Sequence, residues 1–137
     1  MTASTGIRYV TCMRITIDQP VGIHFVSAYA PGLIQIGTRS FTSSLIVTAS
    51  TIVEAWRPSR VQEFEPADVE PLLSLGAEVL LIGSGEKQAF PSREVLAALY
   101  RARVGFEIMD TGAACRTYNV LVAEGRNVAA ALMLHRN

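Results

Sequence analysis

The chain has 137 residues, of which half are hydrophobic and 18% are charged, and twelve basic residues balance twelve acidic ones. This length suits one domain with a hydrophobic core, and the composition is too apolar for a disordered chain. The zero net charge excludes a general attraction to nucleic acid or to an anionic membrane surface, and we find no basic patch that would replace it.

The two cysteines, Cys12 and Cys115, are far apart and follow no secretory signal, so no disulfide framework is expected. Neither cysteine nor histidine spacing predicts a zinc site, and no cofactor motif is complete. The longest apolar runs, such as residues 79–82, are far shorter than the ~18 residues that cross a bilayer. We therefore expect a cytoplasmic protein with no membrane span, no metal and no cofactor.

The first half of the chain has the pattern of β-structure. We expect residues 1–12 to form a loosely attached tail and one α/β domain to cover residues 13–137. Short β-branched or aromatic runs, separated by turn residues, predict a meander of antiparallel strands. These runs lie at residues 22–29, 33–36, 44–48 and 51–56, with Phe41 between the second and the third.

The second half alternates strands and helices after a polar connector at residues 57–65. The apolar run at residues 78–83 is bounded by glycines, which is typical of a central strand buried on both faces. Helix caps and apolar stripes predict the other elements. They are helices at 66–75, 92–103 and 110–123 and strands at 105–109 and 127–134.

The order of these elements predicts a three-layer α/β fold with a central mixed sheet, in which an N-terminal antiparallel meander precedes a β-α-β-α-β unit. The strands ending at Gly83 and Met109 should be parallel neighbours. Ligands bind at the carboxyl ends of such strands. The candidate binding crevice comprises Gly83, Ser84, Gly85, Asp110, Thr111, Gly112, Cys115, Arg116, Tyr118 and Asn119.

The glycine loop at residues 83–85 matches a dinucleotide-binding fingerprint poorly. Gln88 stands where the third glycine is needed, and the next helix begins about seven residues after Gly85. A tight exit from a buried strand explains the loop better. Asp110 is likewise explained as a helix cap, and the alternative is a small anion cradle made by Gly112, the following amides and Arg116.

Cys115 lies in the first helical turn and precedes Arg116, two features that lower a thiol pKa. The alanines before it indicate burial, and the histidines, His24 and His135, are distant in sequence. We therefore interpret Cys115 as a packing residue, and a reactive thiol is the alternative.

The segment Thr117-Tyr118-Asn119 places poor helix formers in the middle of a predicted helix. Their polar groups should have partners. We expect them to bond the neighbouring strands and loop, or else to line the crevice with Ser84.

The run from Met109 to Leu121, MDTGAACRTYNVL, followed by Glu124-Gly125-Arg126, closely resembles the signature of the family that includes mitochondrial complex I assembly factor 3. Ala30 stands where the family commonly has glycine, and Ser84 where it commonly has threonine. The resemblance implies a three-layer fold with additional β-structure, and this chain is similar to the small prokaryotic members. Further matching segments lie at residues 28–32, 81–85 and 90–91.

The resemblance favours a non-enzymatic assembly factor that holds a protein partner at the crevice or the adjoining surface, with no catalytic residue assigned. Complex I assembly itself describes the eukaryotic relatives. One alternative is a small-molecule site, with or without catalysis, for an anionic metabolite at Ser84, Gly85, Gly112 and Arg116, with Cys115 as an optional nucleophile. Another is a homo-oligomer in which an exposed edge strand pairs with itself.

Overall fold

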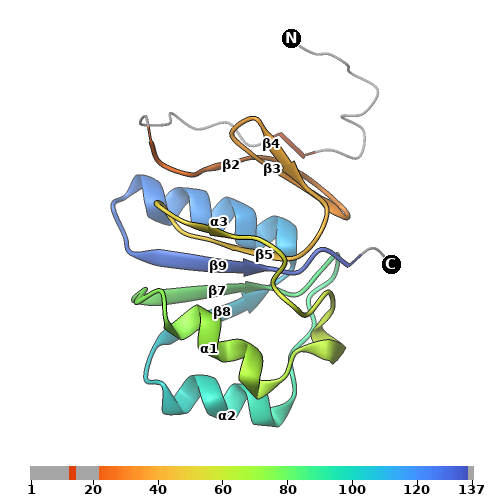
Figure 1. The fold of residues 1–137 in the computed structure, drawn as a ribbon, viewed down its shortest axis with the longest axis vertical. Coiled ribbons are helices and arrows are strands. Elements are labelled where there is room, and N and C mark those ends of the chain that lie inside the picture. The colour runs from red at the N-terminus through yellow and green to blue at the C-terminus, as the bar shows by residue number, and fades with distance from the viewer. Residues whose placement is uncertain (1–12, 15–21, 136–137) are drawn as a thin grey trace.

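The structure is a computed structural model, and it describes residues 13–14 and 22–135 (Figure 1). The tail predicted at residues 1–12 lies outside the described residues. The first four strands form an antiparallel sheet in the order β1-β2-β3-β4. They are β1 (Met13–Arg14), β2 (Val26–Ala30), β3 (Leu33–Ile36) and β4 (Arg39–Phe41).

The second sheet has five strands in the order β6-β5-β9-β7-β8. Strand β7 pairs in parallel with β8 and β9, whereas β5 pairs antiparallel with β6 and β9, so the sheet is mixed as predicted. The bounds are β5 (Leu45–Val47), β6 (Ile52–Val53), β7 (Val79–Gly83), β8 (Gly105–Met109) and β9 (Val128–Leu132).

Two details differ from the sequence prediction. The meander is divided between the two sheets, because β5 and β6 extend the mixed sheet instead of continuing β4. Strand β7 has neighbours on both sides, but β9 takes the middle position. Both differences arise because β9, the last strand in the chain, lies between β5 and β7.

Helices cover both faces of the mixed sheet, giving the predicted three-layer α/β arrangement with the first sheet added outside it (Figure 1). Helix α3 (Thr111–Ala123) packs against β7 and β9 on one side and against β2 on the other. On the opposite face lie η2 (Val61–Glu63), η3 (Pro66–Val69), α1 (Glu70–Leu73) and α2 (Arg93–Arg101).

The core consists of two hydrophobic clusters, one on each face of the mixed sheet. Alternate residues of β9 enter each cluster: Ala130 and Leu132 face α3, while Ala129 and Ala131 face α1 and α2. Small side chains at these positions let helices approach both faces closely. As a result α3 packs against both sheets, and its exposed residues are confined to the stripe formed by Arg116, Val120 and Ala123.

The polar connector after β6 is fixed by one acidic residue. Arg57 donates to both carboxylate oxygens of Asp68, at 2.9 and 2.6 Å, and this guanidinium lowers the pKa of the Asp68 carboxyl. The Trp56 indole donates to the Asp68 carbonyl at 3.2 Å and meets the Phe64 ring edge-on. These contacts hold η2 in place at the carboxyl ends of the parallel strands.

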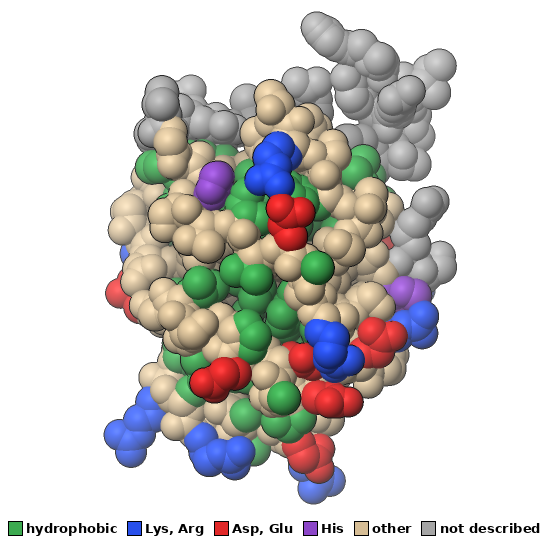
Figure 2. Space-filling model, viewed as in Figure 1, with side chains coloured by type: hydrophobic (Ala, Val, Ile, Leu, Met, Phe, Trp, Pro, Cys, Tyr) green, Lys and Arg blue, Asp and Glu red, His purple; other side chains and the backbone are tan. Residues whose placement is uncertain are grey.

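The surface carries both signs of charge. Figure 2 shows acidic and basic side chains interspersed over one face, with hydrophobic side chains gathered near its middle. No helix in the described part of the chain is long and apolar enough to cross a membrane. The same residues contain no group of three or more His, Cys, Asp and Glu side chains placed to hold a metal ion.

Candidate functional site

The structure brings the two predicted loop segments together. Gly83 and Met109 are partners in the parallel ladder, and the Ser84 amide donates to the Met109 carbonyl at 2.8 Å. One step further along, the Thr111 amide donates to the Gly85 carbonyl, also at 2.8 Å. The ends of β7 and β8 are therefore bonded directly to each other.

The space between these ends is filled by Thr111, which is fully buried. Its hydroxyl accepts from the Gly85 amide at 2.8 Å and donates to the Met133 carbonyl at 2.7 Å, so both hydrogen-bonding functions are used. A Cβ atom at Gly83 would lie only 2.9 Å from the Thr111 Cα. The glycine thus allows α3 to begin directly against β7, leaving no room there for a ligand.

Ser84 is also bonded within the loop. Its hydroxyl donates to the Lys87 carbonyl at 2.8 Å, with the Met109 carbonyl at 3.2 Å, and accepts from the Ala89 amide at 3.0 Å. The side chain is 7% exposed. Ser84 therefore shapes the loop that follows β7, and its hydroxyl faces into that loop.

The start of α3 has the geometry of an ordinary capped helix. The Asp110 carboxylate accepts from the Ala113 amide at 2.8 Å, which is the capping bond expected from the sequence. Gly112 lies against the Tyr29 ring of β2. A Cβ atom added at Gly112 would come within 3.1 Å of a carbon of that ring. The predicted anion cradle is therefore covered by β2 at Gly112.

The polar residues in the middle of α3 join it to the first sheet. The Asn119 side chain accepts from the Val26 amide at 2.9 Å and donates to the Val26 carbonyl at 2.8 Å. The Tyr118 hydroxyl donates to the His24 carbonyl at 2.7 Å. The sequence left two interpretations of Thr117-Tyr118-Asn119 open, bonding to neighbouring strands and loop or lining the crevice. These bonds agree with the first.

Cys115 is buried with no exposed surface, and Arg116 beside it is exposed. Burial raises the pKa of the Cys115 thiol to about 12, even though the nearby Arg116 guanidinium favours the thiolate. Such a thiol is protonated and inaccessible at neutral pH. These features fit a packing residue and do not support a nucleophile.

A small hollow lies next to this closed crevice, at the same edge of the sheet. Its volume is about 120 Å³. Three basic residues from distant parts of the sequence border it, together with the carboxylate of Glu86. The lining residues include Arg60, Gln62, Gly85, Glu86, Lys87 and His135. We call the loop at residues 84–90 together with Arg60, Gln62 and His135 the carboxyl rim.

Tyr29 of β2, whose ring lies against Gly112, is 7% exposed. Burial, with smaller contributions from Cys115, Glu86 and Asp110, raises the pKa of its phenol to about 12. Its hydroxyl has no hydrogen-bond partner among the residues that the structure describes. The phenol therefore stays protonated at neutral pH.

The family described as "Protein of unknown function (DUF498/DUF598)" matches residues 26–133. The chain belongs to this family. The DUF498/DUF598 match extends from β2 to just beyond β9, so it includes every strand except β1 and every residue of the carboxyl rim except His135.

Named relatives of this DUF498/DUF598 chain differ in their descriptions. It is 30% identical over 121 residues to the "13 kDa major membrane protein" of Francisella tularensis, covering 88% of this chain and 96% of that one. It is 26% identical to the bovine NADH dehydrogenase (ubiquinone) 1 alpha subcomplex assembly factor 3 over 85% of this chain. The alignment spans 63% of the bovine protein. The family resemblance read from the sequence is therefore confirmed.

The fold is shared with solved structures of bacterial proteins. A crystal structure from Bordetella parapertussis has a TM-score of 0.77 and 33% identity, covering 85% of this chain and 99% of the other. At this identity, the common fold of the family includes the two-sheet arrangement around α3.

Sequence reasoning placed a candidate site at this edge of the sheet but did not name most of the residues that are exposed there. Arg60 and His135 lie 75 positions apart, and no local pattern connects them. Lys87 had one signal, since it is the sole lysine in the sequence. The predicted residues from Thr111 to Asn119 turned out to be mostly internal, with Arg116 the main exception.

Proposed function

We propose that this DUF498/DUF598 protein is a non-enzymatic, cytoplasmic protein-binding module, and that the carboxyl rim holds a segment of its partner. The observation that carries the proposal is the contrast between the two parts of this edge. The polar groups of the predicted crevice are bonded internally, whereas the rim directly beside it presents basic and aromatic side chains to solvent.

The chemistry of the crevice supports a binding function over catalysis. A hydrolase or transferase that forms a covalent intermediate needs an accessible nucleophile with a base beside it. Cys115 is buried with a raised pKa, and the hydroxyls of Ser84 and Thr111 are both committed to hydrogen bonds within the protein. The groups at this edge stabilise the loop and the start of α3.

The exposed residues of the rim suit a protein partner. Phe90 is 65% exposed although it follows a well-packed loop, and aromatic side chains of this kind are common anchors in protein interfaces. Lys87, Arg60 and His135 border the adjacent hollow. An apolar side chain of the partner would contact Phe90, and a neighbouring acidic side chain would lie near the basic groups.

The named relatives give independent support for an assembly or scaffolding function. The bovine relative is described as an assembly factor for NADH dehydrogenase. The alignment covers 63% of that protein, so the shared part is the domain described here. Binding a protein partner is a more general property than complex I assembly, and it is the one that the two proteins could have in common.

The proposal is tested by capturing the tagged protein from its native host and identifying co-purifying proteins by mass spectrometry. We expect a stoichiometric partner that is lost from Phe90→Ala and from Lys87→Glu. Tyr100→Ala is the matched control, because Tyr100 is 71% exposed on α2, outside the rim. Circular dichroism checks that each variant is folded. If every folded rim variant retains the partner, the rim is not its binding site.

The small hollow also favours a second candidate, a site for a small anion. Its volume of about 120 Å³ is below the ~300–1,000 Å³ of pockets for drug-sized ligands, so only an anion of a few heavy atoms would fit. Thermal shifts with inorganic phosphate and with acetate would test this directly. A stabilisation that depends on Lys87 and occurs without any protein partner would favour the small-anion function.

A further inference from the structure

The amino ends of β7 and β8 border a second, larger pocket on the side of the sheet that α1 and α2 cover. Its volume is about 510 Å³, within the range typical of small-molecule sites. Because β7 and β8 are parallel, this pocket lies at the opposite edge from the carboxyl rim. Its apolar lining consists of Leu72, Leu73, Ala77, Leu80, Ala102 and Val104.

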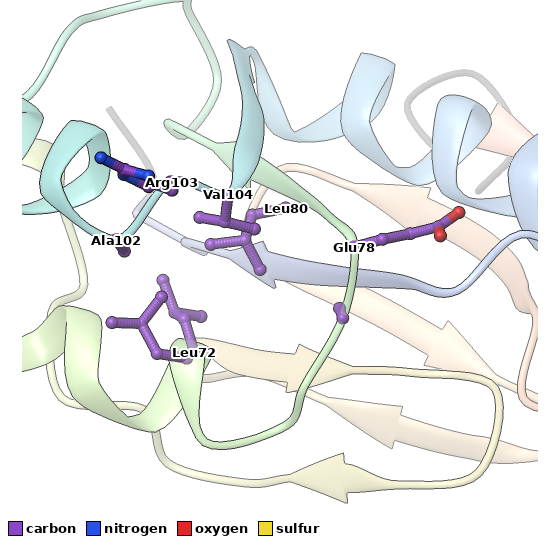
Figure 3. A pocket seen from close by; sticks show the side chains of 8 residues that line it. Leu72, Glu78, Leu80, Ala102, Arg103 and Val104 are labelled. Atoms are coloured by element: carbon purple, nitrogen blue, oxygen red, sulfur yellow. The ribbon is translucent and has the colours of Figure 1, made fainter.

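Two charged residues complete the lining, and their situations differ. Glu78 is paired with Arg126, with 3.0 Å between the carboxylate and the guanidinium Nε. Arg103 has neither an ion pair nor a side-chain hydrogen bond within the part of the chain described. Figure 3 shows the Glu78 carboxylate pointing away from the hollow and Arg103 on its other side, next to Ala102 and Val104. The side chains that line the pocket are thus mostly apolar, and Arg103 is the charged one that has no ion pair among the described residues.

The backbone conformation at Arg103 is unusual for an arginine. Its φ of 57° is in the left-handed region, directly after the C-cap of α2, and its amide donates to the Tyr100 carbonyl at 3.1 Å. Glycine is the usual residue at this position, because a Cβ atom makes the conformation less favourable. An arginine that carries this strain and has no internal partner points to an external one.

We propose that this pocket binds a small aliphatic carboxylate, with its hydrocarbon chain against Leu72, Leu80 and Val104 and its carboxylate on the Arg103 guanidinium. An acyl chain needs no hydrogen bonds along its length, and six of the eight side chains that line the pocket are apolar. A peptide would bring backbone amides and carbonyls that this lining leaves unsatisfied. The single exposed cation matches a single anionic head group.

The test is a titration of the full chain with decanoate, below its micelle concentration, followed by amide chemical shifts. We expect shifts confined to residues 72–80 and 102–104. Shortening the ligand to octanoate should weaken binding about 15-fold, since each buried methylene contributes roughly fourfold. Decylamine, which has the same chain and the opposite charge, should not bind.

Arg103→Gly separates ligand binding from folding. The glycine relieves the left-handed strain, so this variant should melt at a higher temperature than the wild type while binding decanoate at least tenfold more weakly. Arg103→Lys should retain most of the affinity. Arg101→Ala is the matched control, because it removes an exposed charge of α2 outside the pocket lining and should leave the affinity unchanged.

Three results would overturn the proposal. They are an absence of decanoate binding by the folded wild type, equal binding by Arg103→Gly, and shifts scattered over the whole surface. A partner protein captured by the wild type and lost from Arg103→Glu, with decanoate inert, would instead make this pocket a protein-docking site. Since the rim variants test a different edge of the sheet, failure here leaves the proposed function unaffected.

Discussion

Asn119 should be one of the most sensitive positions in the protein, because its side chain bonds both backbone groups of the buried Val26. Replacing Asn119 by Ala removes bonds of 2.9 and 2.8 Å and leaves the buried amide and carbonyl of Val26 without partners. Each unsatisfied backbone group costs about 1–3 kcal/mol, so the total loss should be about 2–6 kcal/mol. For a domain with an unfolding free energy of about 5–15 kcal/mol, such a loss is large.

The assay is urea unfolding followed by circular dichroism, with wild type and variant fitted to a common slope. The matched control is Thr117→Ala on the same helix, because the Thr117 hydroxyl makes only one long contact, 3.5 Å to the Met109 sulfur. Alanine is also the better helix former, so this variant should be neutral or slightly more stable. A loss below about 1 kcal/mol for Asn119→Ala would refute the claim that this side chain joins α3 to the first sheet.

The remaining predictions concern packing, ionisation and association. Gly83→Ala should destabilise the fold by about 1–3 kcal/mol in thermal unfolding, because the new Cβ would lie 2.9 Å from the backbone of α3. Gly105→Ala is the control: its Cβ would have its nearest contact at 3.6 Å, so stability should change by less than about 0.5 kcal/mol. Burial raises the pKa of Cys115 from 9.0 to about 12, so unfolding releases a proton in this range and the unfolding free energy should fall with pH by up to about 1.4 kcal/mol per unit. In a Cys12→Ser background, the Cys115 thiol should react with a thiol reagent only as fast as the protein unfolds, and a rate near that of a free thiol at pH 8 would contradict its burial. The exposed edge of β8 should resist pairing with a second copy of itself, because an antiparallel pair of β8 strands centred on Glu107 would place two carboxylates opposite each other. Glu107→Val should therefore increase self-association in analytical ultracentrifugation.

Local signals in the sequence were enough to predict the second half of the fold. Ser92 and Asp110 cap their helices with side-chain bonds, and Gly125 follows the end of α3 with a φ of 80°. Each signal acts within a few residues, so the boundaries of α2 and α3 agree closely with the prediction. The parallel pairing of β7 with β8 followed from the helix between them.

The division of the first half into two sheets had no such signal. Strand β5 pairs with β9, and Ile46 faces Ala131 across 85 positions of sequence. A turn between two short β-branched runs predicts a hairpin, but it does not say which sheet the hairpin joins. That choice depends on the total apolar surface that β9 offers, which is a property of the assembled fold.

The same non-local packing explains why most residues of the candidate crevice lie inside the protein. A helix packed against a single sheet would leave some of Thr111, Tyr118 and Asn119 near a ligand, but α3 is covered by β2 as well as by β7 and β9. Its polar side chains therefore bond backbone groups of the first sheet and of the chain just beyond β9. Their low helix propensity was the one sequence signal of this unusual environment.

Burial therefore divides the residues that carry the family resemblance into two groups. Thr111, Cys115 and Asn119 are buried, and their contacts account for their identities through the fold alone. Phe90 belongs to a matching segment as well, yet it is 65% exposed, whereas Pro91 beside it is buried. Packing explains the proline and leaves the phenylalanine unexplained, and an aromatic side chain held in solvent by a well-bonded loop is best accounted for by a surface that covers it. This is the physical reason to look for the partner at the carboxyl rim, where Phe90 lies, and not along the signature helix.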